Sequence, residues 1–163
     1  MQIIFLPVEW SIALCFILWP VLQISISTIC LFVPDTFYKK DIFLFRTLKW
    51  ERKGKFYDTI FKIRKWKRFL PDGAAIVKSG FQKKHLEQMS SEYIKKYLVE
   101  SRRAELGHWL AILPFWIFGL FTPFPVIIYM FLYAIIINLP CILAQRYNRP
   151  RFLEVLKKIE ERE

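Results

Sequence analysis

The basic residues of this chain are confined to two stretches. All 25 Lys and Arg residues fall within 39–103 or 146–162, and none occurs in 1–38 or 104–145, which are strongly apolar. Placing one Lys or Arg at the centre of a bilayer costs on the order of 3 kcal/mol on insertion scales. A soluble protein of this length would mix apolar and polar residues throughout, whereas here the apolar residues form blocks. The partition therefore predicts an all-α integral membrane protein with about three transmembrane helices.

The apolar blocks divide a single membrane domain, residues 1–163, into spans and connecting segments. At about 1.5 Å per residue, the first block more than covers a hydrocarbon core of about 30 Å. The second block is short and contains Pro114, and a Thr-Pro-Phe-Pro turn at 122–125 separates it from the third. The last two blocks thus predict a helical hairpin that either spans the bilayer or is re-entrant. The predicted spans are 6–33, 106–121 and 126–144, with a cytoplasmic segment at 34–105 and a cytoplasmic tail at 145–163.

The charge balance of the connecting segments predicts their orientation. Residues 33–108 carry 19 Lys and Arg against 9 Asp and Glu, and the tail carries 6 against 4. The first 32 residues and the 122–125 turn contain no Lys or Arg. The positive-inside rule therefore places the middle segment and the tail in the cytoplasm, and the N-terminus and the turn outside. Because the N-terminus lacks the basic region and cleavage site of a signal peptide, we expect the first block to be a mature span.

The middle segment combines basic and aromatic residues in a pattern typical of a membrane-surface helix. On a helix, one side would carry Phe56, Ile60, Ile63 and Leu70, with Trp66 at its edge. Such a basic amphipathic helix lies at the headgroup level and contacts anionic lipid. Pro71-Asp72-Gly73 would end it, and a second helix is expected from about Gln82 to Arg103.

One of the two histidines has a carboxylate at helical spacing. Glu105 and His108 are at positions i and i+3, on one face of a helix, where a carboxylate can orient the imidazole. An imidazole held in this way suits a general base that takes a proton from a hydroxyl. The alternative is a pair that only anchors the helix at the membrane surface. The other histidine, His85, follows two lysines on a polar stretch and is a reserve candidate for the base.

A second polar string begins where the third apolar block ends. It reads Gln-Arg-Tyr-Asn-Arg-Pro-Arg over residues 145–151. In an antiparallel hairpin this string and the segment around 105–109 would reach the same cytoplasmic boundary, and arginine side chains suit phosphate recognition. Flanking arginine of the positive-inside kind is the alternative. The predicted substrate-binding residues are Arg102, Arg103, Arg146, Asn148, Arg149, Trp109 and Trp66.

Other functional classes have less support. Cys15, Cys30 and Cys141 lie in apolar blocks without metal-ligand spacing, so neither a metal site nor a disulfide is expected. The positive charge would suit nucleic acid, but three apolar blocks do not. Asn138, inside the third block, could hydrogen-bond across helices, but a role in helix–helix packing is favoured.

Four distinctive strings occur in order along the chain. They are Gly54-Lys55-Phe56, Arg64-Lys65-Trp66-Lys67, Arg103-Ala104-Glu105-Leu106 with His108-Trp109, and residues 145–151. With these strings the chain resembles the glycosyl-4,4'-diaponeurosporenoate acyltransferases, over about Val33 to Arg151. The family pattern has a histidine directly after the Asp72-Gly73 turn, where this chain has Ala74, so a histidine there is not expected to be required.

The resemblance implies a small multi-pass protein of the bacterial cell membrane that performs the last step of staphyloxanthin-type pigment synthesis. A fatty acyl group would move from a thioester, with acyl-CoA as co-substrate, to a sugar hydroxyl of a glycosylated C30 carotenoid. No other cofactor is implied. The site assignment comes from the residues themselves and not from the family. In this reaction His108 would be the base and Glu105 would orient it, and Arg102, Arg103, Arg146 and Arg149 would bind the donor phosphate or the oxyanion.

Three alternatives stay open at this point. The chain could acylate another glycolipid, or it could be a non-catalytic lipid-binding or scaffold subunit that associates with other pigment-pathway enzymes. An acyl hydrolase, which would release free fatty acid without an acceptor, is the third.

Overall fold

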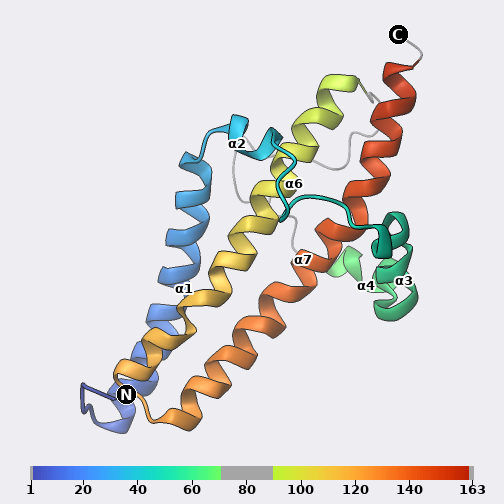
Figure 1. The fold of residues 1–163 in the computed structure, drawn as a ribbon. Helices are drawn as coiled ribbons and strands as arrows, with labels where there is room; N and C mark the ends of the chain where they lie inside the picture. The colour runs from blue at the N-terminus through green and yellow to red at the C-terminus, as the bar shows by residue number, and fades with distance from the viewer. Residues whose placement is uncertain (1, 71–89, 162–163) are drawn as a thin grey trace. The chain divides into compact units, whose positions relative to one another are not determined.

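The computed structural model describes residues 2–70 and 90–161, and in these residues helices joined by short connecting segments are present without any β-strand (Figure 1). Two compact units are present. The first comprises Met1–Val33 with Ala104–Leu139, and the second comprises Pro34–Arg103 with Pro140–Glu163. The described helices are α1 (Val8–Phe32), α2 (Asp35–Lys39), η1 (Lys49–Gly54), α3 (Lys55–Phe61), α4 (Ile63–Trp66), η2 (Lys67–Phe69), α6 (Ser91–Ile112), η3 (Leu113–Leu120) and α7 (Phe124–Glu160).

The first unit contains three antiparallel segments: α1, the end of α6 with η3, and the first part of α7 (Figure 1). Its core gathers around Trp19 of α1, whose ring centroid lies 5.3 Å from that of Phe118 and 5.1 Å from that of Tyr133. The backbone N–H groups of Ile3 and Ile4 both donate to the carbonyl of Leu120 at 2.9 Å, which ties the N-terminus to the end of η3. The end of α6 with η3 runs antiparallel to the first part of α7, and the ring centroid of Phe115 lies 4.8 Å from that of Phe131 on α7.

The outside of the first unit is apolar. Large hydrophobic side chains are exposed along α1 and along the first part of α7. By length and composition, α1 and α7 can each cross a membrane, and they are the two described helices of which this holds. The first predicted span, 6–33, contains α1, and the third, 126–144, lies within α7. The exposed set includes Phe5, Trp10, Phe16, Ile24 and Phe32 from the N-terminal segment, and Phe124, Tyr129, Leu132 and Ile136 from α7.

The second predicted span is not one continuous α-helix. It is divided between the end of α6 at Ile112 and the 3₁₀-helix η3, which has Pro114 in its first turn. Proline has no N–H for the α-helical ladder and its ring clashes with a carbonyl one turn earlier, so the helix changes to the tighter form here. By contrast, α7 runs through Pro140 and Pro150 and takes in the predicted tail as far as Glu160.

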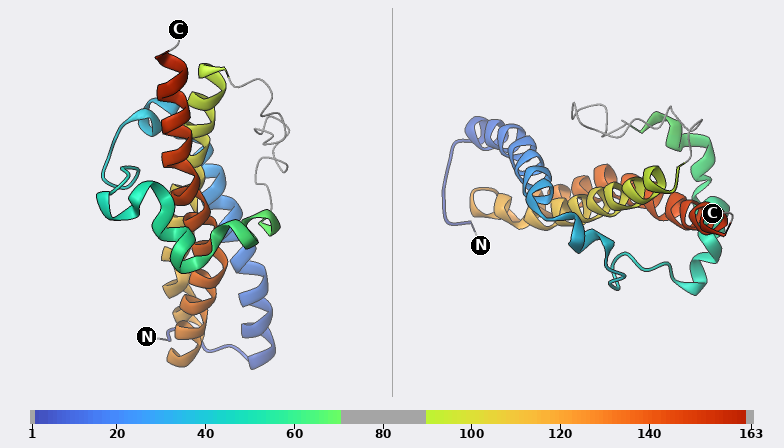
Figure 2. Two further views of the ribbon diagram at one scale, coloured as in Figure 1. Left: turned by 90° about the vertical axis from the view of Figure 1, so that its right-hand side faces the viewer. Right: turned by 90° about the horizontal axis from the view of Figure 1, so that it is seen from above.

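In the second unit, the segment 34–69 passes around the C-terminal half of α7 (Figures 1 and 2). Tyr57 and Ile63 pack with Tyr147 of α7, and all three side chains are buried. The single amphipathic helix expected over 56–70 is not formed. Lys62 has a left-handed backbone conformation (φ 50°) that separates α3 from α4.

The residues that are buried in segment 56–70 are not the ones that a single amphipathic helix would bury. Ile63 is fully buried, whereas Ile60 and Phe61 are exposed, because the break at Lys62 turns the chain between them. Several predictions for the following segment lie outside the described residues: the Pro71-Asp72-Gly73 turn, His85, and the start of the helix expected at Gln82. The described part of that helix begins at Ser91 and continues past Arg103 into the first unit.

Candidate functional site

His108 is bonded to Asn138 in the first unit. Its Nδ1 lies 2.9 Å from Oδ1 of Asn138, which joins α6 to α7. Asn138 also donates from Nδ2 to the carbonyl of Ala134, one turn earlier on α7, at 2.9 Å. Asn138 is 1% exposed and His108 is half-buried. Asn138 thus makes a hydrogen bond across helices, and its partner is the candidate base.

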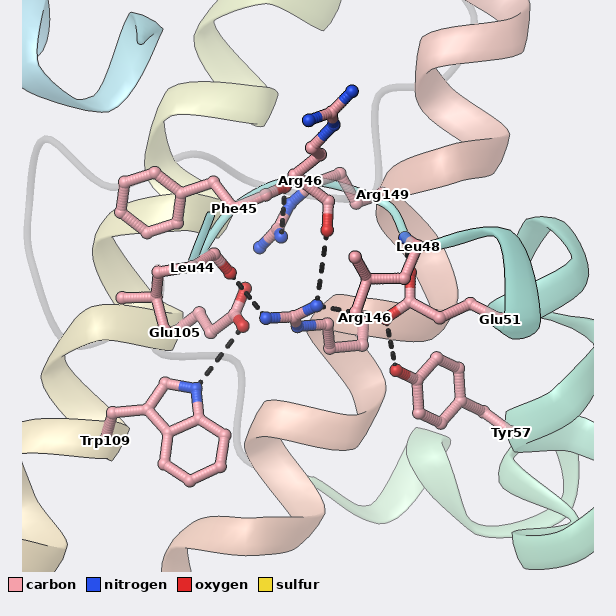
Figure 3. Close-up of polar contacts among 10 residues, drawn as sticks. All are labelled: Leu44, Phe45, Arg46, Leu48, Glu51, Tyr57, Glu105, Trp109, Arg146 and Arg149. Carbon is pink, nitrogen blue, oxygen red and sulfur yellow. Dashed lines mark hydrogen bonds and ion pairs between the residues drawn. The ribbon is translucent and has the colours of Figure 1, made fainter. Parts of the chain in front are cut away.

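Glu105 does not provide the hydrogen bond to His108 that the sequence suggested. The carboxylate is fully buried, and it accepts a hydrogen bond from Nε1 of Trp109 at 3.4 Å, one turn further along α6 (Figure 3). Glu105 therefore bonds to Trp109, four residues further along the helix, and not to His108, three residues further along. Trp109 itself is exposed.

Gly107 lies beside the candidate base where α1 meets α6. A Cβ added at Gly107 would have Sγ of Cys30 as its neighbour at 3.8 Å, which is an ordinary van der Waals contact. Gln23 of α1 also donates to the carbonyl of Ala111 on α6 at 3.1 Å. These contacts hold α1 against the segment that carries His108.

In the second unit, Arg146 is the centre of a buried polar network (Figure 3). Its guanidinium donates to Glu51 at 3.0 Å and also to the backbone carbonyl of Leu44. Glu51 is 1% exposed, and its carboxylate further accepts from the Tyr57 hydroxyl at 2.5 Å and the Leu48 N–H at 2.8 Å. A buried carboxylate is stable only when it is paired and hydrogen-bonded in this way.

The other predicted arginines also bind the 35–46 segment. Arg102 donates to the carbonyl of Tyr38 at 2.7 Å, and Arg149 donates to that of Phe45 at 3.1 Å. Arg103 pairs with Asp35 and with Glu100. Burial lowers the pKa of Arg103, but hydrogen bonds and attraction from these two carboxylates outweigh it and hold the pKa above its ordinary value. The four arginines thus fix this segment onto α6 and α7 within the second unit.

Asn148 and Trp66 also lie in the second unit. Asn148 accepts a hydrogen bond from Nζ of Lys67 at 2.9 Å, and the same ammonium lies 4.8 Å from the centroid of the Tyr147 ring. Trp66 donates from Nε1 to the carbonyl of Phe61 at 2.7 Å and packs against the buried cluster around Tyr147. Of the predicted site residues, Glu105, His108 and Trp109 lie in the first unit, and the others that the structure describes lie in the second.

Sequence reasoning did not identify Glu51, the buried carboxylate that binds Arg146. The one local signal is its place three residues after Leu48, at the start of η1, where a glutamate can reach back to the N-cap N–H. Among the described residues, no group of three or more His, Cys, Asp or Glu side chains could hold a metal ion.

Comparisons with known proteins agree with the resemblance found in the sequence. The family model described as glycosyl-4,4'-diaponeurosporenoate acyltransferase matches residues 34–158. Two relatives from Staphylococcus aureus, strains bovine RF122 / ET3-1 and N315, carry that name and are 35% and 34% identical over 148 residues. These alignments cover 91% of this chain and 89% of each relative. No solved structure matches the chain.

Proposed function

The chain belongs to the glycosyl-4,4'-diaponeurosporenoate acyltransferase family, and from this premise we propose that it moves a fatty acyl group from acyl-CoA to a sugar hydroxyl of a glycosylated C30 carotenoid. This would be the last step of staphyloxanthin-type pigment synthesis. The acceptor is the one in the relatives' name, and acyl-CoA is proposed as the donor because a thioester is an activated form of a fatty acyl group. The protein needs no further cofactor in this proposal.

His108 is the general base of the proposed reaction. The observation that carries this role is its hydrogen bond to the buried Asn138, because such a bond fixes the ring while leaving its second nitrogen for a substrate. The imidazole takes the proton of the sugar hydroxyl as that oxygen attacks the thioester carbonyl. The tetrahedral intermediate then loses the thiolate by cleavage of its carbon–sulfur bond. The imidazolium returns the proton to sulfur, and the products are the sugar ester and free CoA.

The assignment of substrate-binding residues stays a prediction. Arg102, Arg103, Arg146 and Arg149 would contact the donor phosphates or the oxyanion, with Asn148, Trp109 and Trp66 beside the substrates. The hydrogen bonds described above tie these arginines to the protein itself, so a phosphate would have to share or displace them. Their second contribution is the ordering of segment 35–51.

We further propose that the chain crosses the membrane three times, with the N-terminus outside and the basic residues in the cytoplasm. The 3₁₀ form of η3 supports the middle span. Residues 106–112 as α-helix and Leu113–Leu120 as 3₁₀-helix rise about 26 Å, against about 22 Å for the same residues in α-helix alone. The longer rise brings this short block close to the thickness of the hydrocarbon core.

Segment 49–69 would lie at the cytoplasmic headgroups. Exposed basic side chains alternate there with exposed apolar ones, although the segment is not one helix. Anionic lipid attracts the basic side chains, and the membrane interface accommodates the apolar ones. The exposed apolar residues are Trp50, Ile60, Phe61 and Phe69, and the exposed basic residues include Lys49, Arg52, Lys55, Arg64 and Lys65.

The test is an assay of the purified protein in lipid vesicles with an acyl-CoA and the glucosylated carotenoid, with the ester measured by mass spectrometry. We expect product from the protein alone. His108→Gln should lower turnover by about 10²–10⁴-fold, the usual contribution of a general base, whereas His85→Gln should not. Wild-type turnover of His108→Gln would remove His108 from the mechanism.

The same assay separates the alternatives. Product that forms only after other pathway enzymes are added would identify a scaffold subunit. Free fatty acid without acceptor would identify a hydrolase. Ester formation on a different glycolipid, but not on the carotenoid, would keep the reaction and change the acceptor.

A further inference from the structure

The orientation of the Asn138 amide can be read from its two neighbours. Nδ2 lies 2.9 Å from the carbonyl oxygen of Ala134, which only accepts hydrogen bonds. If the amide were turned over, Oδ1 would face that oxygen and two acceptors would oppose each other in a buried place. The orientation that places Oδ1 toward His108 is therefore the one that satisfies both groups.

This orientation decides which nitrogen of His108 carries the proton. An amide oxygen cannot donate, so Nδ1 of His108, 2.9 Å away, must be the donor. A neutral imidazole with its proton on Nδ1 has its lone pair on Nε2. The part of the chain that the structure describes provides no hydrogen bond to Nε2, so this nitrogen is left for a substrate.

We propose that Asn138 is a positioning residue that holds His108 in the Nδ1–H tautomer and presents Nε2 as the base. The inference rests on the proposed function, in which His108 takes the proton of the acceptor hydroxyl. It replaces Glu105, which the sequence suggested for this role. The partner of Nδ1 commonly sets the tautomer of a histidine in proteins.

The location of Asn138 supports this role. It lies between apolar residues of α7, where a polar side chain is costly unless it is fully hydrogen-bonded, and it is 1% exposed. A leucine of similar volume would fill the site and avoid that cost. The amide is thus best explained by what it does for its partner on α6.

Nuclear magnetic resonance of the imidazole nitrogens tests the tautomer directly. The chain has two histidines, so His85→Gln in the full-length protein leaves His108 as the single labelled ring. With ¹⁵N-histidine, in nanodiscs, at a pH where the ring is neutral, we expect Nε2 to give the signal of an unprotonated nitrogen and Nδ1 that of a protonated one. The reverse assignment would overturn the proposal.

A pair of variants links the tautomer to turnover. Asn138→Leu should shift the ring toward the Nε2–H tautomer and lower kcat at least tenfold, up to the roughly 10²–10⁴-fold contribution of a general base, with little change in KM. Gln23→Met is the matched control, since it removes another hydrogen bond between helices of the same unit, from Nε2 of Gln23 to Ala111, without touching His108. Equal losses of kcat in the two variants would assign the effect to packing and reject the positioning role.

The two proposals fail in different ways. If His108→Gln keeps full turnover, the proposed base is wrong, whatever the nitrogen signals show. If His108→Gln abolishes turnover but Asn138→Leu keeps both the tautomer and kcat, the base stands and Asn138 has no positioning role. Should Asn138→Leu fail to fold, the nitrogen signals with Asn138 in place still decide between the two tautomers.

Discussion

Gly54 occupies a backbone position that other residues adopt only with strain. Its φ is 85°, and a Cβ added there would lie 2.7 Å from the carbonyl oxygen of Tyr147. Gly54→Ala should therefore lower the free energy of unfolding by about 2 kcal/mol or more, through the left-handed conformation and the steric overlap. The measurement is unfolding of the detergent-solubilised protein followed by circular dichroism.

Gly107→Ala is the control for this prediction. Its added Cβ would meet Sγ of Cys30, its nearest neighbour outside its own helix, at 3.8 Å, and alanine favours a helix over glycine by up to about 1 kcal/mol. We expect unchanged or slightly increased stability. A loss equal to that of Gly54→Ala would contradict the explanation from backbone conformation.

Glu51 is the residue whose loss should damage the second unit most directly. Glu51→Ala would remove the buried carboxylate that pairs with Arg146 and accepts the hydrogen bond of Tyr57, so we expect a loss of roughly 3 kcal/mol, typical of breaking a buried ion pair. The same unfolding experiment measures it. Glu154→Ala, which breaks the exposed ion pair to Lys53, should leave stability unchanged within error.

At the scale of elements, the break between α3 and α4 depends on one residue. Lys62 has φ 50°, a conformation that costs an L-residue about 1–2 kcal/mol and that glycine adopts freely. Lys62→Gly should thus raise stability by up to about 1 kcal/mol, and Lys62→Val, with a branched Cβ, should lower it. If Lys62→Gly destabilised the protein while Lys62→Val did not, the two short helices would instead be one.

The long apolar helices were the most predictable part of the fold. The first block, 6–33, contains α1, and the third, 126–144, lies within α7. The change to a 3₁₀-helix at η3 was not predicted, although Pro114 marks its start. Apolar content decides whether a segment can enter a bilayer, but the type of helix depends on individual backbone hydrogen bonds.

At the scale of the whole molecule, the orientation of the chain is the main prediction. In a background with Cys15, Cys30 and Cys141 replaced by alanine, Phe5→Cys and Phe124→Cys should react with an impermeant maleimide in intact cells. Their side chains are 81% and 71% exposed, and both would lie outside. Lys53→Cys, at an exposed position in the basic segment, should react only after permeabilisation.

The outcome for Phe124→Cys decides the number of spans. If this cysteine stayed unlabelled in intact cells while Phe5→Cys reacted, α6 and η3 would not cross the membrane and the hairpin would be re-entrant. Labelling of Lys53→Cys in intact cells would reverse the predicted orientation.

By itself, the sequence determined where the long apolar segments lie, from which a membrane protein is predicted, and it singled out His108 as the candidate base. The apolar segments follow from composition along the chain, because transfer free energies add residue by residue. Only the tertiary structure decided which groups the candidate site residues bind. His108 pairs with Asn138 instead of Glu105, and Arg146 binds Glu51 and the 44–46 backbone. Such pairs depend on the register between segments far apart in the sequence, which a local pattern of residues does not encode.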